Sequence, residues 1–526
     1  MTFRVTATVL GKRGVTELYA SPSLRFHHVV KQLSQPPQGP PRIRHLSTSQ
    51  CHCQEKSDAS SQRLDEATSK AAKSTASTKV DVASKDQLAD WDTNPDLSIS
   101  EFSELPSRNF GVNQHIIINE EFKEALRQIL WQFRAPIRYA FAYGSGVFPQ
   151  SAAGKTGASL HTHPPEAITK VQGSNQKMID FIFGVSYTQH WHSLNLQEHR
   201  DHYSGLGYLG SYAVSKVQDS FGAGVYFNPF ITVNGTLIKY GVVNIDTLCR
   251  DLSEWDTLYL AGRLQKPVKI LRDNPSVRLA NQVNLISAVR AALLLLPESF
   301  TEQELYSTIA GISYRGDPRM SVGEDPKKVS NIVKYQLGNF RRLYSPLIDN
   351  LPNISFTDSV CKGEDWLDNP NINAKLQQNM DPVTRGHMVR RLPSRFREKL
   401  YFEYQSKFKI PRRDFNEMMQ QVKDEDPERI RRREGGPFER RIAEDVKDGG
   451  LQKEVEQVIS KTVRWPSFTQ SVKGIFTSGL ARSWRYAAEK RAKANAGSAE
   501  QKERSDLEKA KEDKKSNVAA KAEKEH

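Results

Sequence analysis

The 526-residue sequence has few cysteines and no long run of apolar residues. Its four cysteines are scattered, which argues against a disulfide framework, and Cys249 and Cys361 are predicted to be ordinary reduced thiols without a zinc site. The longest aliphatic run, 291–297, is far shorter than the roughly 20 residues that span a bilayer. We therefore expect neither a transmembrane helix nor a disulfide-stabilised fold.

Acidic residues are scarce at the start of the chain. Residues 1–54 contain one acid, Glu17, against seven basic residues and many Ser and Thr. This pattern predicts a mitochondrial transit peptide, and 44–49 (RHLSTS) resembles a matrix processing site; a disordered basic tail is the alternative. The whole chain carries a net charge of +14. That charge favours an anionic partner, which could be a nucleotide, a nucleic acid or an acidic membrane.

Composition divides the rest of the chain into further regions. A Ser-, Ala- and Lys-rich stretch predicts a disordered linker over 55–109. A helix is expected within 118–133, with Asn119 as its N-cap, and a hairpin is expected around Asn234-Gly235. Helices follow, one of them with a capping box formed by Thr301 and Glu304. The predicted regions are a catalytic domain over 110–274, a helical domain over 275–350, a charged region of exposed helices over 351–461, an amphipathic helix over 462–493 and a charged tail over 494–526.

The stretch from Tyr139 to Val185 is the main candidate for chemistry. Its first apolar run ends at Gly144-Ser145-Gly146, where small residues let backbone N–H groups approach a phosphate. Its last apolar run carries Asp180, and a lone acid in a buried strand needs a partner such as Mg²⁺. An ordinary tight turn and an acid paired with an arginine remain the alternatives. The polar segment 151–176 between the two runs is interpreted as a surface insertion.

Two further groups of polar residues accompany this stretch. Around a proline turn, Arg263, Lys266 and Lys269 could clamp a polyphosphate or could form a solvated basic face, and Lys239 lies on the outgoing strand of the expected hairpin. Histidines fit no standard zinc spacing, so they are interpreted as surface, turn or substrate-pocket residues; they are His161, His163, His190, His192, His199 and His202.

Near the C-terminus, one helical stripe of apolar residues alternates with cations. Such a helix suits an anionic membrane interface, although docking against the protein's own core is the alternative. The expected membrane-binding residues are Phe468, Val472, Ile475, Phe476, Leu480 and Trp484, with Lys473, Arg482 and Arg485 as the cations.

Seven blocks, in this order, resemble the mitochondrial phosphatidate cytidylyltransferases, or CDP-diacylglycerol synthases, of the translocator assembly and maintenance protein family. The blocks are YGSGVFPQ, MIDFIFGV, HWHSLN with HYSGL, GAGVYFNPF, IKYGVV, YLAGRLQKPVKIL and SVKGIFTSGLARSWRY. The resemblance is dense over about 110–347 and resumes over about 462–490. It implies an α/β (α+β) nucleotidyltransferase-fold catalytic domain, a winged-helix-like domain and a C-terminal amphipathic helix on the matrix face of the mitochondrial inner membrane.

The resemblance also implies the reaction of CTP with phosphatidate to give CDP-diacylglycerol and pyrophosphate, with Mg²⁺, on the route to cardiolipin. Tyr143 and the Gly144-Ser145-Gly146 turn would then hold phosphates, Ser145, Asp180 and Lys239 would be catalytic, and Asp180 would bind the metal. The other three cations, Arg263, Lys266 and Lys269, would bind phosphates of either substrate.

The sequence departs from the usual nucleotidyltransferase pattern at one position. That pattern has a second acid two residues after the first, and here Ile182 stands there. Asp246 and Asp251 are the candidates for a second metal ligand. A nucleotidyltransferase acting on nucleic acid and a non-enzymatic import factor are the alternative functions; under the leading one, no nucleic-acid partner is expected, and the oligomeric state is not indicated.

Overall fold

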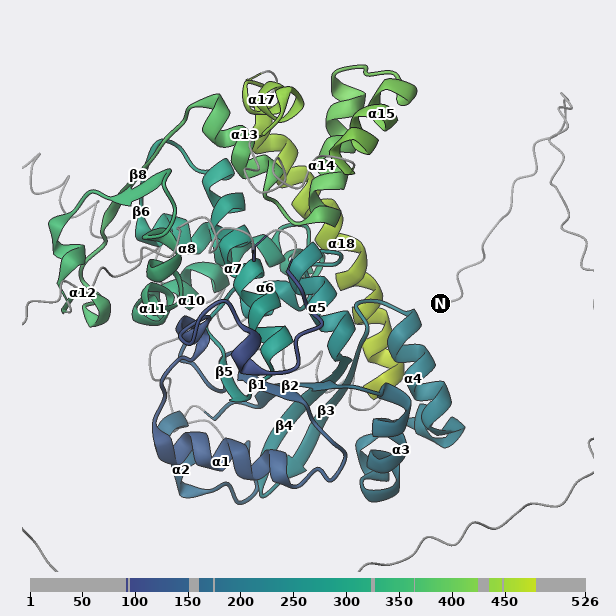
Figure 1. Cartoon of the computed structure of the whole chain (residues 1–526). Helices are drawn as coiled ribbons and strands as arrows, with labels where there is room; N and C mark the ends of the chain where they lie inside the picture. The colour runs from purple at the N-terminus through teal and green to yellow at the C-terminus, as the bar shows by residue number, and fades with distance from the viewer. Residues whose placement is uncertain are drawn as a thin grey trace, which may run out of the picture. The chain divides into compact units, whose positions relative to one another are not determined.

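A five-stranded mixed sheet forms the first half of the fold (Figure 1). Its strand order is β3-β4-β2-β1-β5. β1 is antiparallel to β2 and β5, β2 is parallel to β4, and β3 and β4 form the hairpin expected around Asn234-Gly235. The strands are β1 (Tyr139–Tyr143), β2 (Ile179–Val185), β3 (Val225–Val233), β4 (Thr236–Asn244) and β5 (Lys269–Arg272).

The computed structural model describes residues 91–92, 95–150, 160–173, 176–322, 327–363, 365–423, 435–446 and 449–478. All of them belong to one compact unit. The predicted transit peptide, most of the predicted linker, the charged tail and four of the predicted membrane-binding residues lie outside the described residues. Those four are Leu480, Arg482, Trp484 and Arg485.

Helices cover the sheet because its strands are apolar on both faces. In β2, six of the seven residues are buried and only Asp180 is partly exposed. The predicted first helix is confirmed, and the Asn119 side chain caps it by accepting a hydrogen bond from the Phe122 N–H. The elements of this half are η2 (Phe102–Glu104), η3 (Val112–Gln114), α1 (Glu120–Trp131), α2 (Glu166–Gln172), α3 (Thr188–Glu198), η4 (Arg200–His202), η5 (Gly205–Leu209), α4 (Gly210–Ser220), α5 (Ile245–Glu254) and α6 (Ala261–Leu264).

The second half is built around one long helix, α7 (Pro275–Leu295), of which nearly every residue is buried. The capping box of Thr301 and Glu304 at the start of α8 is confirmed. A small sheet of order β6-β8-β7 lies here too, and no strand was predicted in this region. The elements are β6 (Ser299–Thr301), α8 (Glu302–Gly311), η6 (Ile312–Tyr314), α9 (Arg319–Val322), α10 (Lys328–Tyr335), α11 (Leu337–Ile348), β7 (Ile354–Phe356), η7 (Ser359–Lys362), α12 (Asp365–Asp368) and β8 (Lys375–Gln378).

The region 351–461 differs from the exposed helices that its charge predicted. It supplies β7 and β8, and Phe396, Leu400 and Tyr404 of α14 are fully buried. Long charged side chains mark the outer face of such helices, and the few apolar residues between them were enough to form a core face. The remaining helices are α13 (Pro382–Arg390), α14 (Ser394–Lys407), α15 (Arg412–Lys423), α17 (Pro437–Ala443) and α18 (Gly450–Ser478).

Helix α18 runs without a break across the boundary predicted between 461 and 462. It packs against α7 and α14 and then against β3 (Figure 1). Among the described residues, no helix has both the length and the apolar character needed to cross a membrane.

Part of the predicted linker belongs to the fold. Leu105 is buried, and the Asp92 carboxylate pairs with the Arg290 guanidinium of α7 inside the protein. The low hydrophobicity of this segment predicted disorder. One buried ion pair and a few apolar contacts are nevertheless enough to hold it against the fold.

We expect Arg341→Met to destabilise the second half strongly. The Arg341 guanidinium and the Glu302 carboxylate are fully buried, and their atoms lie 2.6 Å apart. Removing the arginine leaves a buried carboxylate without its cation, which costs about 3–5 kcal/mol. Arg342→Met is the matched control, because Arg342 pairs with Asp368 at the surface and such pairs contribute about 0–1 kcal/mol. Urea unfolding of the two variants measures the difference, and equal midpoints would contradict the prediction.

Candidate functional site

One pocket collects most of the residues that the sequence singled out. From the first half of the fold it is lined by Tyr143, Gly144, Ser145, Asp180, Lys239, Arg263 and Lys266. From the second half and α18 it is lined by Ser313, Tyr314, Asp317, Arg319, Lys328 and Ser467, among others. Among the described residues, five cations and two carboxylates face it. The pocket therefore suits a ligand that carries several negative charges.

The strand register places the central acid of this pocket. Asp180 on β2 is paired with Tyr143 of β1 on one side and with Lys239 of β4 on the other. The Lys239 Nζ lies 3.5 Å from Asp180 Oδ1 and 4.6 Å from the centroid of the Phe227 ring. Because paired residues share a face of the sheet, all three side chains reach the same end of the pocket.

The glycine-serine turn follows β1 directly and lies against this acid. Gly144 has a φ of +79°, and a Cβ there would be 3.4 Å from Asp180 Oδ2. Ser145 also lines the pocket, whereas Gly146 does not. A Cβ at Gly146 would stand 2.5 Å from the Met178 carbonyl oxygen, so this glycine serves close packing rather than the predicted phosphate contact.

The pocket cations are held by aromatic and carbonyl groups. Arg263 donates to the Tyr143 hydroxyl at 3.3 Å and to the Tyr259 carbonyl, and its guanidinium lies 4.0 Å from the Tyr259 ring centroid. Lys266 Nζ donates to Ser313 Oγ at 2.9 Å and to the Gly262 carbonyl. Burial, followed by the charges of Arg263 and Lys328, lowers the pKa of Lys266 to about 7. These cations repel one another when the pocket holds no anion.

Lys269 does not belong to this cluster, so its predicted role in binding phosphate is wrong. Its ammonium is buried elsewhere and donates to the Ile116 carbonyl at 2.7 Å. The side chains of consecutive strand residues alternate between the two faces of a sheet, and sequence proximity to Lys266 gave no information on the face that Lys269 would take.

Sequence reasoning did not predict that residues from the second half of the fold line the pocket. Asp317, Arg319 and Lys328 line the pocket, and the Arg319 guanidinium forms a two-pronged pair with the buried Asp317 carboxylate, with a shortest distance of 2.6 Å. Asp317 and Arg319 lie between two of the expected helices, and Lys328 lies at the start of the next one. The density of polar and charged residues over 313–320 was the available signal, but only the packing of η6 against α6 shows that this stretch faces the first half.

Neither candidate for a second metal ligand lies at Asp180. Asp251 is buried, and its carboxylate accepts hydrogen bonds from the N–H groups of Leu258, Leu260 and Ala261, so it stabilises that loop. Asp246 follows β4, whose last residue, Asn244, is five residues beyond the Lys239 register position, about 16 Å along the strand. Both predictions are therefore wrong.

The residues at Asp180 nevertheless fit a divalent cation. Its Oδ1 atom is buried and accepts no hydrogen bond from the described residues, and the Lys239 ammonium, 3.5 Å away, is the nearby positive charge. Mg²⁺ commonly takes one or two carboxylates, and substrate phosphates and water complete its coordination. A single carboxylate beside a polyphosphate pocket matches that donor set.

The buried histidines are structural. His192 contacts the Tyr203 hydroxyl and Gln218 Oε1 at 2.8 Å each, and burial lowers its pKa to about 4. His202 Nδ1 lies 2.9 Å from the Tyr240 hydroxyl. The expected surface position of His161 is wrong, because it is buried and accepts a hydrogen bond from the Leu237 N–H at 3.0 Å.

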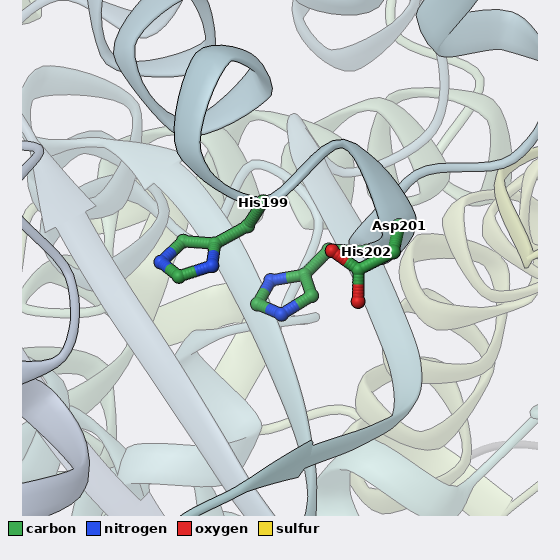
Figure 2. Close-up of side chains that lie close together, drawn as sticks. All are labelled: His199, Asp201 and His202. Carbon is green, nitrogen blue, oxygen red and sulfur yellow. The ribbon is translucent and has the colours of Figure 1, made fainter.

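His199, Asp201 and His202 lie close enough together to suggest a metal site (Figure 2). The two imidazole rings, however, are stacked with 5° between their planes and 4.6 Å between their centroids. The nitrogen lone pairs lie in the ring planes, and one ion cannot lie in two separate parallel planes. This arrangement does not form a metal site.

The family model described as "Phosphatidate cytidylyltransferase, mitochondrial" matches residues 126–493. The chain belongs to the mitochondrial phosphatidate cytidylyltransferase family. Relatives from several organisms carry the same name. One from Danio rerio is 38% identical over 367 residues, which cover 69% of this chain and 92% of the relative. One from Schizosaccharomyces pombe is 36% identical over 377 residues (71% and 84%), and one from Homo sapiens is 44% identical over 246 residues (46% and 49%).

The match to the mitochondrial phosphatidate cytidylyltransferase family contains the whole pocket. The pocket's residues run from Tyr143 on β1 to Ser467 on α18, and both ends lie inside 126–493. The second half of the fold and α18 therefore belong, with the sheet, to the segment that this family shares.

Helix α18 combines docking with an exposed apolar face. Phe468, Val472, Ile475 and Phe476 are between 39% and 69% exposed. Lys473 is not on the exposed basic face where it was expected. It is buried, and its Nζ donates to the Phe221 carbonyl at 2.6 Å and to the Gln218 carbonyl at 3.2 Å.

Proposed function

We propose that this protein transfers the cytidylyl group of CTP to phosphatidate and forms CDP-diacylglycerol and pyrophosphate. The single observation that carries the proposal is the position of Asp180, between a glycine-serine turn and five cations in one pocket. Family membership supports the choice of substrates, because the relatives are named for this activity.

The nucleotide half of the pocket is assigned to the turn and the first strands. Gly144 and Ser145 would face the triphosphate through backbone and hydroxyl donors, and Asp180 would hold the Mg²⁺ that accompanies it. When bound, Mg²⁺ offsets negative charge on the triphosphate and on the leaving pyrophosphate. Lys239 lies beside Asp180, where it can contact the same phosphates.

In the reaction, a phosphate oxygen of phosphatidate forms a bond to the α-phosphorus of CTP. The bond from that phosphorus to the oxygen bridging to the β-phosphorus breaks, and pyrophosphate leaves with the electron pair. The nucleophile is already an anion, so no side chain has to remove a proton. The task of the protein is to hold two anions together, and the pocket cations Arg263, Lys266, Arg319 and Lys328 supply the charge for this.

The proposal extends to the fold and to the location. The mixed sheet with its surrounding helices would be a nucleotidyltransferase catalytic domain, and α7 to α11 with the small sheet would be a winged-helix-like domain. The exposed face of α18 would attach the enzyme to the matrix side of the mitochondrial inner membrane, where the product would feed cardiolipin synthesis. An amphipathic face with aromatic residues supports this attachment.

An assay with labelled CTP tests the function. We expect the purified protein to convert CTP and phosphatidate into CDP-diacylglycerol, with one pyrophosphate released for each lipid product, and to stop when a chelator removes Mg²⁺. ATP, GTP and UTP serve as controls for the base. Extension of an added RNA by CTP, without lipid product, would instead favour a nucleotidyltransferase that acts on nucleic acid.

A further inference from the structure

A second exposed apolar surface lies beside α18, on the catalytic half of the fold. Tyr208, Leu209 and Tyr212, at the junction of η5 and α4, are 84%, 70% and 65% exposed. We call these three residues the η5–α4 ridge. Large apolar side chains grouped at this exposure are unusual on a monomer surface and mark a site of interaction.

Hydrogen bonds join the segment that carries the ridge to α18. Ser204, just before η5, donates from its hydroxyl to the Phe476 carbonyl at 2.8 Å. The other end of α4 is joined as well, because Lys473 donates to the Phe221 carbonyl. In Figure 1 the C-terminal part of α18 lies alongside α4. The ridge and the exposed face of α18 therefore keep a fixed relation to each other.

The loop after α4 strengthens this connection. Gln470 of α18 donates to the Val225 carbonyl at 2.9 Å and accepts from the Ala223 N–H at 3.3 Å. Gly222 has a φ of +66°, and a Cβ there would lie 2.7 Å from Gln470 Oε1, so glycine permits this close approach. The contacts run from Gln470 to Phe476, nearly two turns of α18, and are too many for a mobile tether.

The chemistry of the ridge suits a lipid surface. Tyrosine combines an apolar ring with a polar hydroxyl and is enriched where headgroups meet acyl chains. The Arg200 guanidinium lies 3.9 Å from the centroid of the Tyr208 ring, and Lys216 is exposed one turn after Tyr212. Positive charge beside exposed aromatic rings favours an anionic membrane over a neutral one.

We propose that the η5–α4 ridge and the exposed face of α18 dock together on one anionic membrane surface. The proposal rests on the proposed function for its choice of membrane. Two attachment points fixed to the same half of the fold would set the orientation of the catalytic domain on the membrane. With a single amphipathic helix as the attachment, the domain can rotate about that helix.

Flotation of the full chain with lipid vesicles tests the ridge. The variant Tyr208→Ser/Leu209→Ser should bind vesicles of phosphatidylglycerol and phosphatidylcholine about tenfold more weakly than the unchanged protein, because both apolar contacts are lost. Ile117→Ser is the matched control. Ile117 is 78% exposed. The carbonyl of its neighbour Ile116 accepts a hydrogen bond from Lys269 of β5, and β5 is the edge strand opposite β3. Loss of the Ile117 side chain should therefore leave vesicle binding unchanged. Vesicles of phosphatidylcholine alone should bind every form weakly.

Two further measurements keep the result interpretable. On a short-chain phosphatidate dispersed in detergent, the ridge variant should turn over CTP at the rate of the unchanged protein. Absence of turnover in both would contradict the proposed function, while the flotation result would still decide the ridge. Vesicle binding of the ridge variant equal to that of the unchanged protein would overturn the proposal. A dimer in solution that the ridge substitutions dissociate would also overturn it, because a second copy would then be the partner.

Discussion

Asp180→Asn is expected to lower the rate of CDP-diacylglycerol formation by about 10³-fold, because a metal-bound carboxylate supports several kcal/mol of transition-state charge stabilisation. The side chain keeps its size, so the fold should be unaffected. The same substitution removes a negative charge next to the proposed triphosphate site. CTP binding without Mg²⁺ should therefore become slightly tighter, while the gain in affinity on adding Mg²⁺ should be lost. Turnover and calorimetric titration with and without Mg²⁺ measure both effects.

Asp246→Asn is the control for this experiment. Asp246 lies at the far end of the parallel pair of strands from Asp180, so its loss should leave turnover and metal dependence unchanged. Full turnover by the Asp180→Asn variant would contradict the assignment of Asp180. A loss of metal dependence in Asp246→Asn would show that the metal site includes groups that this conformation keeps apart.

The sequence predicted local features well where a residue's role depends on its neighbours in the chain. The N-cap Asn119, the capping box at Thr301 and the hairpin at Asn234-Gly235 are all present. The apolar runs at 139–143 and 179–185 are buried strands, and the turn after the first and the acid in the second face one pocket. These features are set by backbone conformation and short-range hydrogen bonds, which a sequence pattern records directly.

Predictions failed where a residue's role depends on tertiary packing. Lys266 and Lys269 are three residues apart, yet only Lys266 reaches the pocket. Asp251 has the residue type of a metal ligand but holds a loop through backbone N–H groups. Lys473 has the spacing of a surface cation and is buried. For Lys269 and Lys473 the face is chosen by an element distant in the sequence, and for Asp251 by the conformation of the loop that follows its helix.

Arg319 and Lys328 also reach the pocket through tertiary packing, which no local sequence pattern records. Their position gives the second half of the fold a direct part in the proposed chemistry rather than the role of a structural companion. The pKa of Tyr259 reports the resulting charge. Burial alone would raise it, but the nearby cations Arg263, Arg319 and Lys239 together lower it. A pocket that stabilises a phenolate in this way will stabilise phosphate anions more strongly, because they carry more charge.

The second large effect is expected at Lys266, whose pKa of about 7 makes CTP binding depend on pH. Below pH 7 the ammonium is charged before CTP arrives, and the phosphates then stabilise it and raise its pKa. Above pH 7 the Lys266 amine of the free protein must take up a proton before its ammonium can pair with the phosphates of CTP. CTP affinity should therefore fall as pH rises above 7, with a slope of up to about tenfold per pH unit. Lys266→Met should bind CTP about 10- to 100-fold more weakly at pH 6.5, because at this pH the substitution removes a hydrogen bond from a charged ammonium to a phosphate.

Three variants isolate this effect. Titration of the CTP phosphates is common to all of them, so differences from the unchanged protein report Lys266 alone. Lys266→Arg keeps the charge at every pH in the range and should bind CTP without the slope above pH 7. Lys269→Met removes another buried lysine outside the pocket, and should lower stability while keeping the slope. CTP dissociation constants measured between pH 6 and 9 decide the matter: an equal slope in Lys266→Met and the unchanged protein would show that another group is responsible.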